Sequence, residues 1–135
     1  MNTLSFPTGE IWVVDDSVAM RLLLRRILQA EFKGWTIREM ANGLDALNNR
    51  DSLLGTSLVI TDMEMPEVDG EAFLERLMGD PLLREKQVLL LSGGGFRGLE
   101  AYYKEFKNVR FLEKPCRPGE IVQVAKEMLA GEARP

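Results

Sequence analysis

The chain has 135 residues, enough for one domain with its own core and too few for two typical domains. Hydrophobic residues make up 45% and charged residues 28%, and the net charge of −4 argues against nucleic acid as the main partner. With one cysteine and no histidine, these residues cannot form an intramolecular disulfide, a histidine-based metal site, or a Ser-His-Asp or Cys-His catalytic centre.

The sequence also lacks the patterns of membrane and secreted proteins. No apolar run approaches the roughly 18 residues that a membrane-spanning helix needs. The first seven residues lack the charged start and apolar centre of a signal peptide. A cytoplasmic protein with no membrane partner is the expectation.

Strand-like and helix-like segments alternate along the chain. In chain order, the pattern predicts a strand at 11–14, a helix from 17 to about 31, a strand at 35–40, a helix at 42–50, a strand at 58–61, a helix at 70–78, a strand at 88–91, a helix at 99–106, a strand at 109–112 and a helix from about 118. Strands that are apolar throughout, such as 88–91, indicate a parallel sheet covered on both faces. The prediction is an α/β fold, a doubly wound five-stranded parallel sheet with helices on both faces.

Carboxylates follow two of these strands directly. Asp15 and Asp16 come after the strand at 11–14, and Asp62 comes after the strand at 58–61. Open parallel sheets bind ligands beyond the carboxyl ends of their strands, so we expect these side chains, Ser92 and Lys114 at one edge. Burying ionised carboxylates there costs free energy unless a divalent cation compensates their charge, so the pattern predicts an acidic metal pocket.

Four motifs stand at the ends of four predicted strands: Val-Val-Asp15-Asp16-Ser, Asp62-Met-Glu-Met-Pro-x-x-Asp-Gly, Leu-Leu-Ser92-Gly, and Phe111-Leu-Glu-Lys114-Pro. With these motifs the chain resembles the receiver domain of two-component response regulators, from residue 10 to about 129. The resemblance implies a flavodoxin-like strand order of 2-1-3-4-5. It implies that residues 1–135 form a single receiver domain with short flexible N- and C-terminal tails.

The resemblance also implies roles for these residues. Asp62 would accept a phosphoryl group from a phosphohistidine of a sensor histidine kinase or a phosphotransfer protein. Mg²⁺, with Mn²⁺ as an alternative, would be held by Asp15, Asp16, Asp62 and the backbone carbonyl of Glu64, because such a cation relieves repulsion between the carboxylate and the phosphoryl oxygens. Lys114 would pair with a phosphoryl oxygen, and its bond to Pro115 would be cis.

Ser92 and Phe111 occupy the family's switch positions. The Ser92 hydroxyl would move onto the phosphoryl group, and Phe111 would turn inward, although a permanently buried core phenylalanine is the alternative. The output would be a changed face on the fourth helix (99–106), the fifth strand (109–112) and the fifth helix (from 118), which contacts a downstream protein. Tyr102, Tyr103 and Phe106 are candidates for it, with core packing as the other interpretation. The domain would be a monomer or a dimer promoted by phosphorylation.

Three features depart from the usual family pattern. Glu64 lies two residues after the acceptor and is expected to alter the lifetime of the phosphorylated state. The glycine-rich segment 93–98 predicts a mobile switch loop. Cys116 stands where an aromatic residue is common, and we interpret it as a small buried hydrophobe.

Two functions of different classes stay open. The first is a stand-alone receiver, a signalling domain whose only chemistry is its own phosphorylation and dephosphorylation, whose output is a protein contact. The alternative is a phosphatase that uses Asp62 as nucleophile on small phosphate esters, although such enzymes carry a second aspartate where Glu64 stands. A receiver that is never phosphorylated is disfavoured because all five site residues are present. The segment Gly93-x-Gly95-x-x-Gly98 matches a dinucleotide-binding fingerprint, but too little chain follows it for the rest of a dinucleotide-binding domain.

Overall fold

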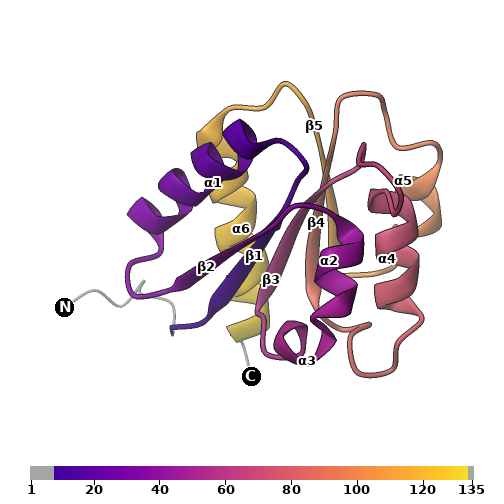
Figure 1. Ribbon diagram of the computed structural model, residues 1–135, viewed down its shortest axis with the longest axis horizontal. Coiled ribbons are helices and arrows are strands. Elements are labelled where there is room, and N and C mark those ends of the chain that lie inside the picture. Colours follow the sequence, from indigo (N-terminus) through magenta and orange to yellow (C-terminus); the bar gives the residue numbers. More distant parts are fainter. Residues whose placement is uncertain (1–7, 134–135) are drawn as a thin grey trace.

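The computed structural model describes residues 8–133, and their side chains to residue 130. Strands and helices alternate through this range as the sequence predicts (Figure 1). The elements are β1 (Glu10–Val14), α1 (Val18–Glu31), β2 (Thr36–Met40), α2 (Gly43–Asn48), α3 (Arg50–Leu53), β3 (Leu58–Asp62), α4 (Gly70–Met78), β4 (Gln87–Ser92), α5 (Leu99–Tyr102), β5 (Val109–Glu113) and α6 (Pro118–Ala133).

The five strands form one parallel sheet in the order β2-β1-β3-β4-β5. This confirms both the fold class and the strand order expected from the family resemblance. Because all strands run in one direction, their carboxyl ends lie along one edge of the sheet. Connections to Asp15, to residues 63–69, to the loop 93–98 and to Lys114 all leave from that edge.

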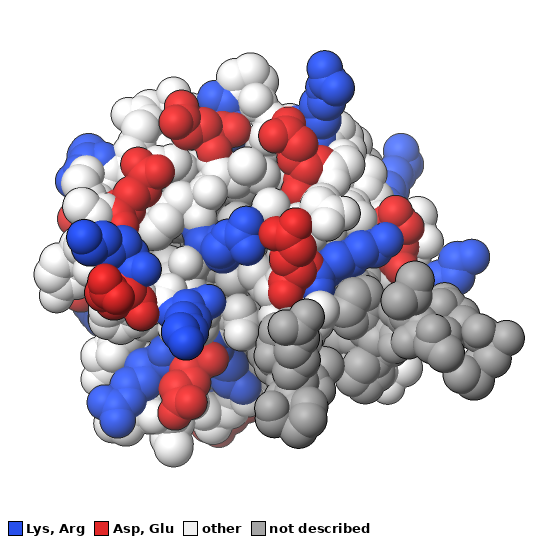
Figure 2. Space-filling view, turned by 180° about the vertical axis from the view of Figure 1, so that it is seen from behind, with Lys and Arg blue, Asp and Glu red and all other residues white. Residues whose placement is uncertain are grey.

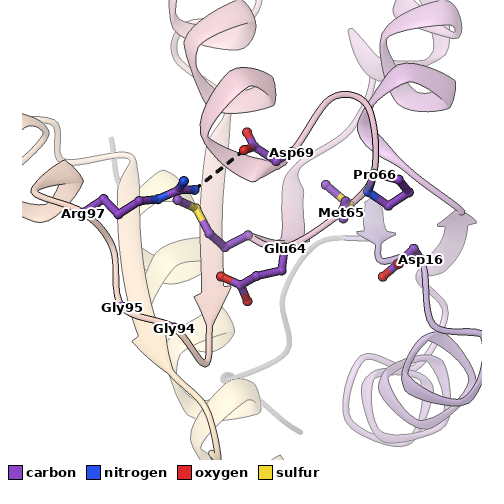
Figure 3. A pocket seen from close by; sticks show the side chains of 9 residues that line it. Asp16, Glu64, Met65, Pro66, Asp69, Gly94, Gly95 and Arg97 are labelled. Atoms are coloured by element: carbon purple, nitrogen blue, oxygen red, sulfur yellow. Dashed lines mark ion pairs between the residues drawn. The ribbon is translucent and has the colours of Figure 1, made fainter.

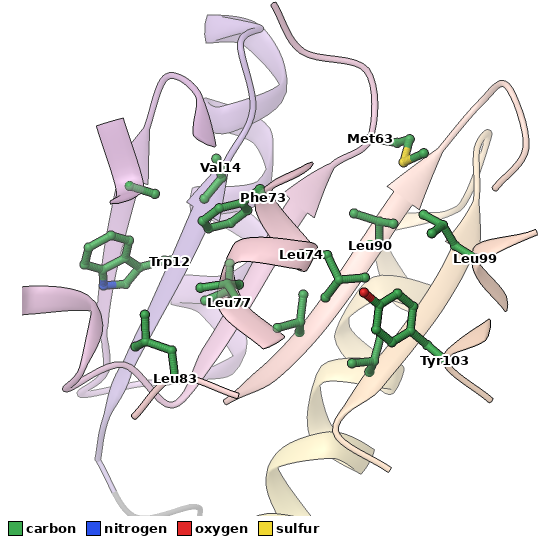
Figure 4. Close-up of a cluster of buried hydrophobic side chains, with 14 of the residues drawn as sticks. Trp12, Val14, Met63, Phe73, Leu74, Leu77, Leu83, Leu90, Leu99 and Tyr103 are labelled. Atoms are coloured by element: carbon green, nitrogen blue, oxygen red, sulfur yellow. The ribbon is translucent and has the colours of Figure 1, made fainter. Parts of the chain in front are cut away.

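Successive strand residues point to opposite faces of the sheet, and each face has its own core. On one face, Trp12, Val14, Val59, Val88 and Leu90 pack under α2 to α5. Figure 4 shows Phe73, Leu74 and Leu77 of α4 lying over these strands. On the other face, Ile11, Val13, Leu58, Ile60, Leu89 and Leu91 pack under α1 and α6. Burial on both faces explains why the strands read as continuous apolar runs.

Helix α4 begins directly beside the end of β3. The Asp69 side chain caps it by accepting a hydrogen bond of 2.9 Å from the Ala72 amide. A Cβ atom on Gly70 would lie 2.5 Å from the Asp62 carbonyl oxygen and 2.7 Å from the Met63 Cα. Only glycine fits there, so Gly70 sets how closely α4 approaches the strand that carries Asp62.

Apart from one-residue shifts at the ends of α1, β1, β3, β4 and β5, the predicted bounds are wrong in three places. The second strand begins at Thr36, because Trp35 turns out of the strand and packs edge-on against Phe32 with ring centroids 5.6 Å apart. The helix expected at 42–50 is α2 followed by a separate turn of helix, α3, which begins beyond a break at Asn49. The helix expected at 99–106 ends at Tyr102, because residues 103–108 turn back towards β5.

Candidate functional site

The candidate site lies at the carboxyl edge of the sheet. β3 ends at Asp62 and β4 at Ser92, and the Lys114 amide donates a hydrogen bond of 2.8 Å to the Ser92 carbonyl. Asp15 follows β1, and its amide donates to the Met40 carbonyl of β2 at 3.1 Å. Backbone bonds therefore fix the positions of residues that are distant in sequence.

Asp15, Asp16 and Asp62 come together as predicted. One carboxylate oxygen from each lies within 4.8 Å of the other two. Asp15 and Asp62 are only 3% and 5% exposed, whereas Asp16 is exposed to solvent. Three carboxylates this close repel one another, and two of them have lost most of their water.

The electrostatics of Asp15 follow from that crowding. Burial raises the pKa of its carboxyl, and the negative charges of Asp62 and Asp16 raise it further. The hydrogen bond of 2.8 Å from the Ser17 amide to Asp15 Oδ1 lowers the pKa, as does Lys114, without cancelling the rise. Burial and the neighbouring carboxylates thus disfavour an uncompensated negative charge on Asp15.

Asp62 and Lys114 form an ion pair in which Lys114 Nζ lies 2.6 Å from Asp62 Oδ1. Burial raises the pKa of Asp62, Lys114 opposes that rise, and the charge of Glu64 adds to it. For Lys114, burial alone lowers the pKa, but the contact with Asp62 outweighs burial and the net pKa is raised. Lys114 is thus held as a cation beside the predicted acceptor. The peptide bond from Lys114 to Pro115 is cis, as the resemblance implied.

The donor set fits a small divalent cation. Its ligands are all carboxylate oxygens, the type that Mg²⁺ prefers. Among the described residues, Oδ1 of Asp62 is a buried side-chain oxygen that receives no well-oriented hydrogen bond despite the nearby Lys114. A buried oxygen of this kind calls for a further positive partner.

Ser92 is almost fully buried and contacts Glu64 from the loop after β3. The Ser92 hydroxyl lies 2.6 Å from Glu64 Oε2 and 2.7 Å from the Gly95 carbonyl oxygen. The amide of Gly94 donates to the same hydroxyl at 3.2 Å. The resting position of Ser92 is therefore defined by the Glu64 side chain and by its own loop.

An open pocket of about 530 Å³ lies beside the acidic cluster. Its lining residues are Asp16, Met63, Glu64, Met65, Pro66, Asp69, Gly94, Gly95 and Arg97. Figure 3 shows Arg97 reaching across the pocket from the β4–α5 loop to Asp69. Arg97 Nη2 lies 3.6 Å from Asp69 and 3.5 Å from Glu71.

Arg97 could not be identified from the sequence as a residue of the site. It has no helical or strand period around it, lies in a glycine-rich segment, and adopts a left-handed backbone with φ of 51°. Only the fold brings it to the start of α4. A single basic residue in a glycine-rich segment carries no sequence pattern that would predict its contact with α4.

The aromatic residues divide into exposed and buried ones. Phe111 is half-buried and packs edge-on against Phe96, with ring centroids 5.1 Å apart. Tyr103 is buried in the core, whereas Tyr102 is 72% exposed and Phe106 is 40% exposed. The core interpretation is therefore correct for Tyr103, and a surface role stays a prediction for Tyr102 and Phe106.

Cys116 is half-buried and packs against the core under α1 and α6. Burial raises the pKa of its thiol, and Glu120 raises it further, against the effect of Lys114. This disfavours the reactive thiolate and agrees with the interpretation of Cys116 as a small hydrophobe, although it is not fully buried.

The sequence profile of the response regulator receiver domain matches residues 11–126. The chain belongs to the response regulator receiver domain family. Receiver domains are phospho-accepting signalling modules that interact with histidine kinases or phosphotransfer proteins and bind Mg²⁺ through acidic residues. The acidic cluster described above stands at the corresponding edge of this receiver domain.

Similar sequences occur within longer proteins. The chain is 33% identical over 120 residues to protein-glutamate methylesterase/protein-glutamine glutaminase 2 of Burkholderia thailandensis, a match that covers 86% of this chain and 33% of that protein. It is 30% identical over 120 residues to a response regulator of Synechocystis sp., covering 87% of this chain and 50% of the other. The chain thus spans a third to a half of these relatives.

Solved receiver structures have the same fold. The signal receiver domain of a signal transduction histidine kinase from Syntrophus aciditrophicus is 31% identical, with a TM-score of 0.78 and a match covering 94% of each chain. A chemotaxis response regulator of Vibrio cholerae is 20% identical, with a TM-score of 0.76, covering 90% of this chain and 99% of that one. The second likeness concerns the fold alone.

Between residues 8 and 133, every helix is too short or too polar to cross a membrane. On the face shown in Figure 2, basic and acidic side chains intermingle and do not gather into a patch of one sign. That face therefore presents no single-sign field to a partner.

Proposed function

We propose that this receiver domain accepts a phosphoryl group on Asp62 from a phosphohistidine of a sensor histidine kinase or phosphotransfer protein, in a Mg²⁺-dependent reaction in the cytoplasm. The observation that supports this most is the meeting of Asp15, Asp16 and Asp62 within 4.8 Å, with Lys114 2.6 Å from Asp62. These residues stand at the carboxyl ends of three separate strands, β1, β3 and β5, at one sheet edge. Mn²⁺ is expected to substitute.

In the proposed transfer, a carboxylate oxygen of Asp62 attacks phosphorus while the bond from phosphorus to the histidine nitrogen breaks. The ring nitrogen keeps the electron pair of that bond and takes a proton from solvent. Asp15, Asp16, Asp62 and the Glu64 backbone carbonyl would hold Mg²⁺, which supplies neutralising charge to the transferred group. Lys114 supports the same group as a fixed cation.

The output in this proposal is a changed protein-contact face. The phosphoryl group adds about −1.5 to −2 charge units, and the Ser92 hydroxyl moves to it. Because β4 leads into the loop 93–98 and α5, this movement alters α5, β5 and α6. Tyr102 and Phe106 are exposed on that side and are proposed contacts for the downstream target. Monomeric resting protein and dimers promoted by phosphorylation both agree with this proposal.

A phosphatase acting on small phosphate esters is not favoured. Such an enzyme needs a free acid beside the nucleophile, and the Glu64 carboxylate is hydrogen-bonded by Ser92. The interpretation as a stand-alone domain stays a prediction, because relatives carry the same region within longer chains.

Incubation with acetyl phosphate and Mg²⁺ tests the proposal. The expected result is one phosphoryl group per chain by intact-protein mass spectrometry, which does not form when a chelator is present from the start and is absent from Asp62→Asn. Continuous hydrolysis of p-nitrophenyl phosphate, abolished by Asp62→Asn, would instead support the phosphatase.

A further inference from the structure

The side chain of Glu64 connects the β3–α4 loop to the β4–α5 loop. The phosphoryl-transfer chemistry alone does not require this contact. One carboxylate oxygen lies 2.6 Å from the Ser92 hydroxyl, and the other receives a long hydrogen bond of 3.4 Å from the Gly93 amide. Glu64 is itself exposed and reaches inward, as Figure 3 shows, towards Gly94. The β3–α4 loop thereby holds the β4–α5 loop at its first residues.

The Ser92 hydroxyl has no spare donor in this arrangement. It carries one proton, which faces both Glu64 Oε2 at 2.6 Å and the Gly95 carbonyl at 2.7 Å. Its oxygen accepts from the Gly94 amide. Because a hydroxyl donates one hydrogen bond, a bond to a new acceptor requires that the bonds donated to Glu64 and to the Gly95 carbonyl both be given up.

We propose that Glu64 is a positioning residue that holds the Ser92 hydroxyl in its resting place and so sets the cost of switching. This inference rests on the proposed function, in which that hydroxyl moves to a phosphoryl group on Asp62. The Glu64 carboxylate and the phosphoryl oxygens compete for one proton. Release is helped by repulsion, because both groups are negative and Glu64 lies only two residues after Asp62.

Arg97 fastens the other end of the same loop more weakly. Its guanidinium lies 3.5 Å and 3.6 Å from carboxylates that are themselves well exposed, and such ion pairs contribute little. The contact of Ser92 with Glu64 is short, charge-assisted and made by a buried hydroxyl, which is the stronger kind of hydrogen bond. We therefore assign the main restraint to Glu64.

The test measures affinity for beryllofluoride, a phosphoryl mimic, by calorimetry at saturating Mg²⁺. Glu64→Ala is expected to bind about fivefold more tightly than the unaltered chain, because part of a charge-assisted hydrogen bond no longer has to be broken. Glu67→Ala is the matched control, since Glu67 is an exposed acid of the same loop and should leave the affinity unchanged. Both substitutions remove one negative charge.

The same comparison in a Ser92→Ala background separates hydrogen bonding from charge. The proposal predicts that the gain from Glu64→Ala is then much smaller, because only charge repulsion is removed, whereas an undiminished gain would overturn it and assign the effect to charge alone. Hydrogen exchange provides a second readout: the amides of Gly93 and Gly94 should exchange faster in Glu64→Ala than in Glu67→Ala, and equal rates would contradict the restraint. An unaltered chain that binds no beryllofluoride would overturn the proposed function along with this inference, whereas tight binding unaffected by Glu64→Ala would overturn this inference alone.

Discussion

Asp15 is a buried carboxyl whose ionisation opposes folding when no cation is bound. Its pKa in the folded chain is raised above the ordinary value of 3.8, mainly by burial and then by Asp62 and Asp16. The stability that the protonated carboxyl contributes to the folded chain is fully present below pH 3.8. This stability is lost as the pH rises through the raised pKa of the folded chain. At neutral pH the ionised Asp15 carboxylate therefore lowers the stability of the cation-free fold, and its value lies in the chemistry of the site.

Asp15→Asn should accordingly raise the melting temperature by a few degrees at neutral pH in the presence of a chelator, because Asn can still accept the Ser17 amide bond without charge. The gain should shrink towards pH 4 (roughly the ordinary pKa of aspartate), where the aspartate is protonated as well. Adding Mg²⁺ should stabilise the unaltered chain more than the variant. Thermal scans at two pH values check this, with exposed Glu105→Gln as the control for loss of one charge.

The contrary result at the residue scale would be a lower melting temperature for Asp15→Asn than for Glu105→Gln in chelator at neutral pH. That outcome would mean that the ionised carboxylate is already compensated in the cation-free fold. Lys114 would then outweigh the burial of Asp15.

At the scale of elements, the closest fit in the site is between the start of α4 and the end of β3. Gly70→Ala would place a Cβ atom 2.5 Å from the Asp62 carbonyl oxygen, so backbone must move. We expect a loss of about 1–3 kcal/mol in unfolding free energy, as for other overpacked sites. Slower phosphorylation should accompany it because Asp62 shifts.

Gly119→Ala is the matched substitution, since a Cβ atom there has no neighbour within 4 Å among the described residues. Urea unfolding of the two variants gives the comparison. Equal stabilities would show that α4 can withdraw from β3 without cost, contrary to the close packing described above.

At the scale of the whole molecule, the proposal divides the domain into a half that responds and a half that does not. Beryllofluoride with Mg²⁺ should change hydrogen exchange in the loop 93–98, α5, β5 and α6, which follow Ser92 along the chain. Exchange in α1, β1 and β2 away from Asp15 should stay the same. Hydrogen exchange with mass spectrometry checks this, and a uniform change over all elements would contradict a local switch.

The sequence predicts the larger features of this molecule well because they depend on local patterns. Continuous apolar runs such as 88–91 require burial on both faces, and acidic residues at strand ends require the shared edge where Asp15 and Asp62 meet. The bounds of α5 were wrong because Tyr103 and Phe106 keep helical spacing while the backbone turns. Tyr103 then packs edge-on against Phe106, with ring centroids 5.0 Å apart.

Contacts between distant loops could not be predicted in the same way. The bond of Ser92 to Glu64 and the ion pair of Arg97 with Asp69 each join residues about thirty apart, and neither leaves a periodic pattern in the sequence. The short helix α3 has the same origin. Its first residue, Arg50, makes two hydrogen bonds of 2.6 and 2.9 Å to Asp80, which stands beyond α4.

The most direct test of the central claim is to locate the phosphoryl group on the chain. After reaction with acetyl phosphate and Mg²⁺, borohydride reduces an aspartyl phosphate to homoserine, which peptide mass spectrometry identifies by position. Homoserine at residue 62, and at no other aspartate, is the predicted result. Reduction at Asp15 or Asp16, or an adduct that persists in Asp62→Asn, would contradict the assignment of Asp62 as the acceptor.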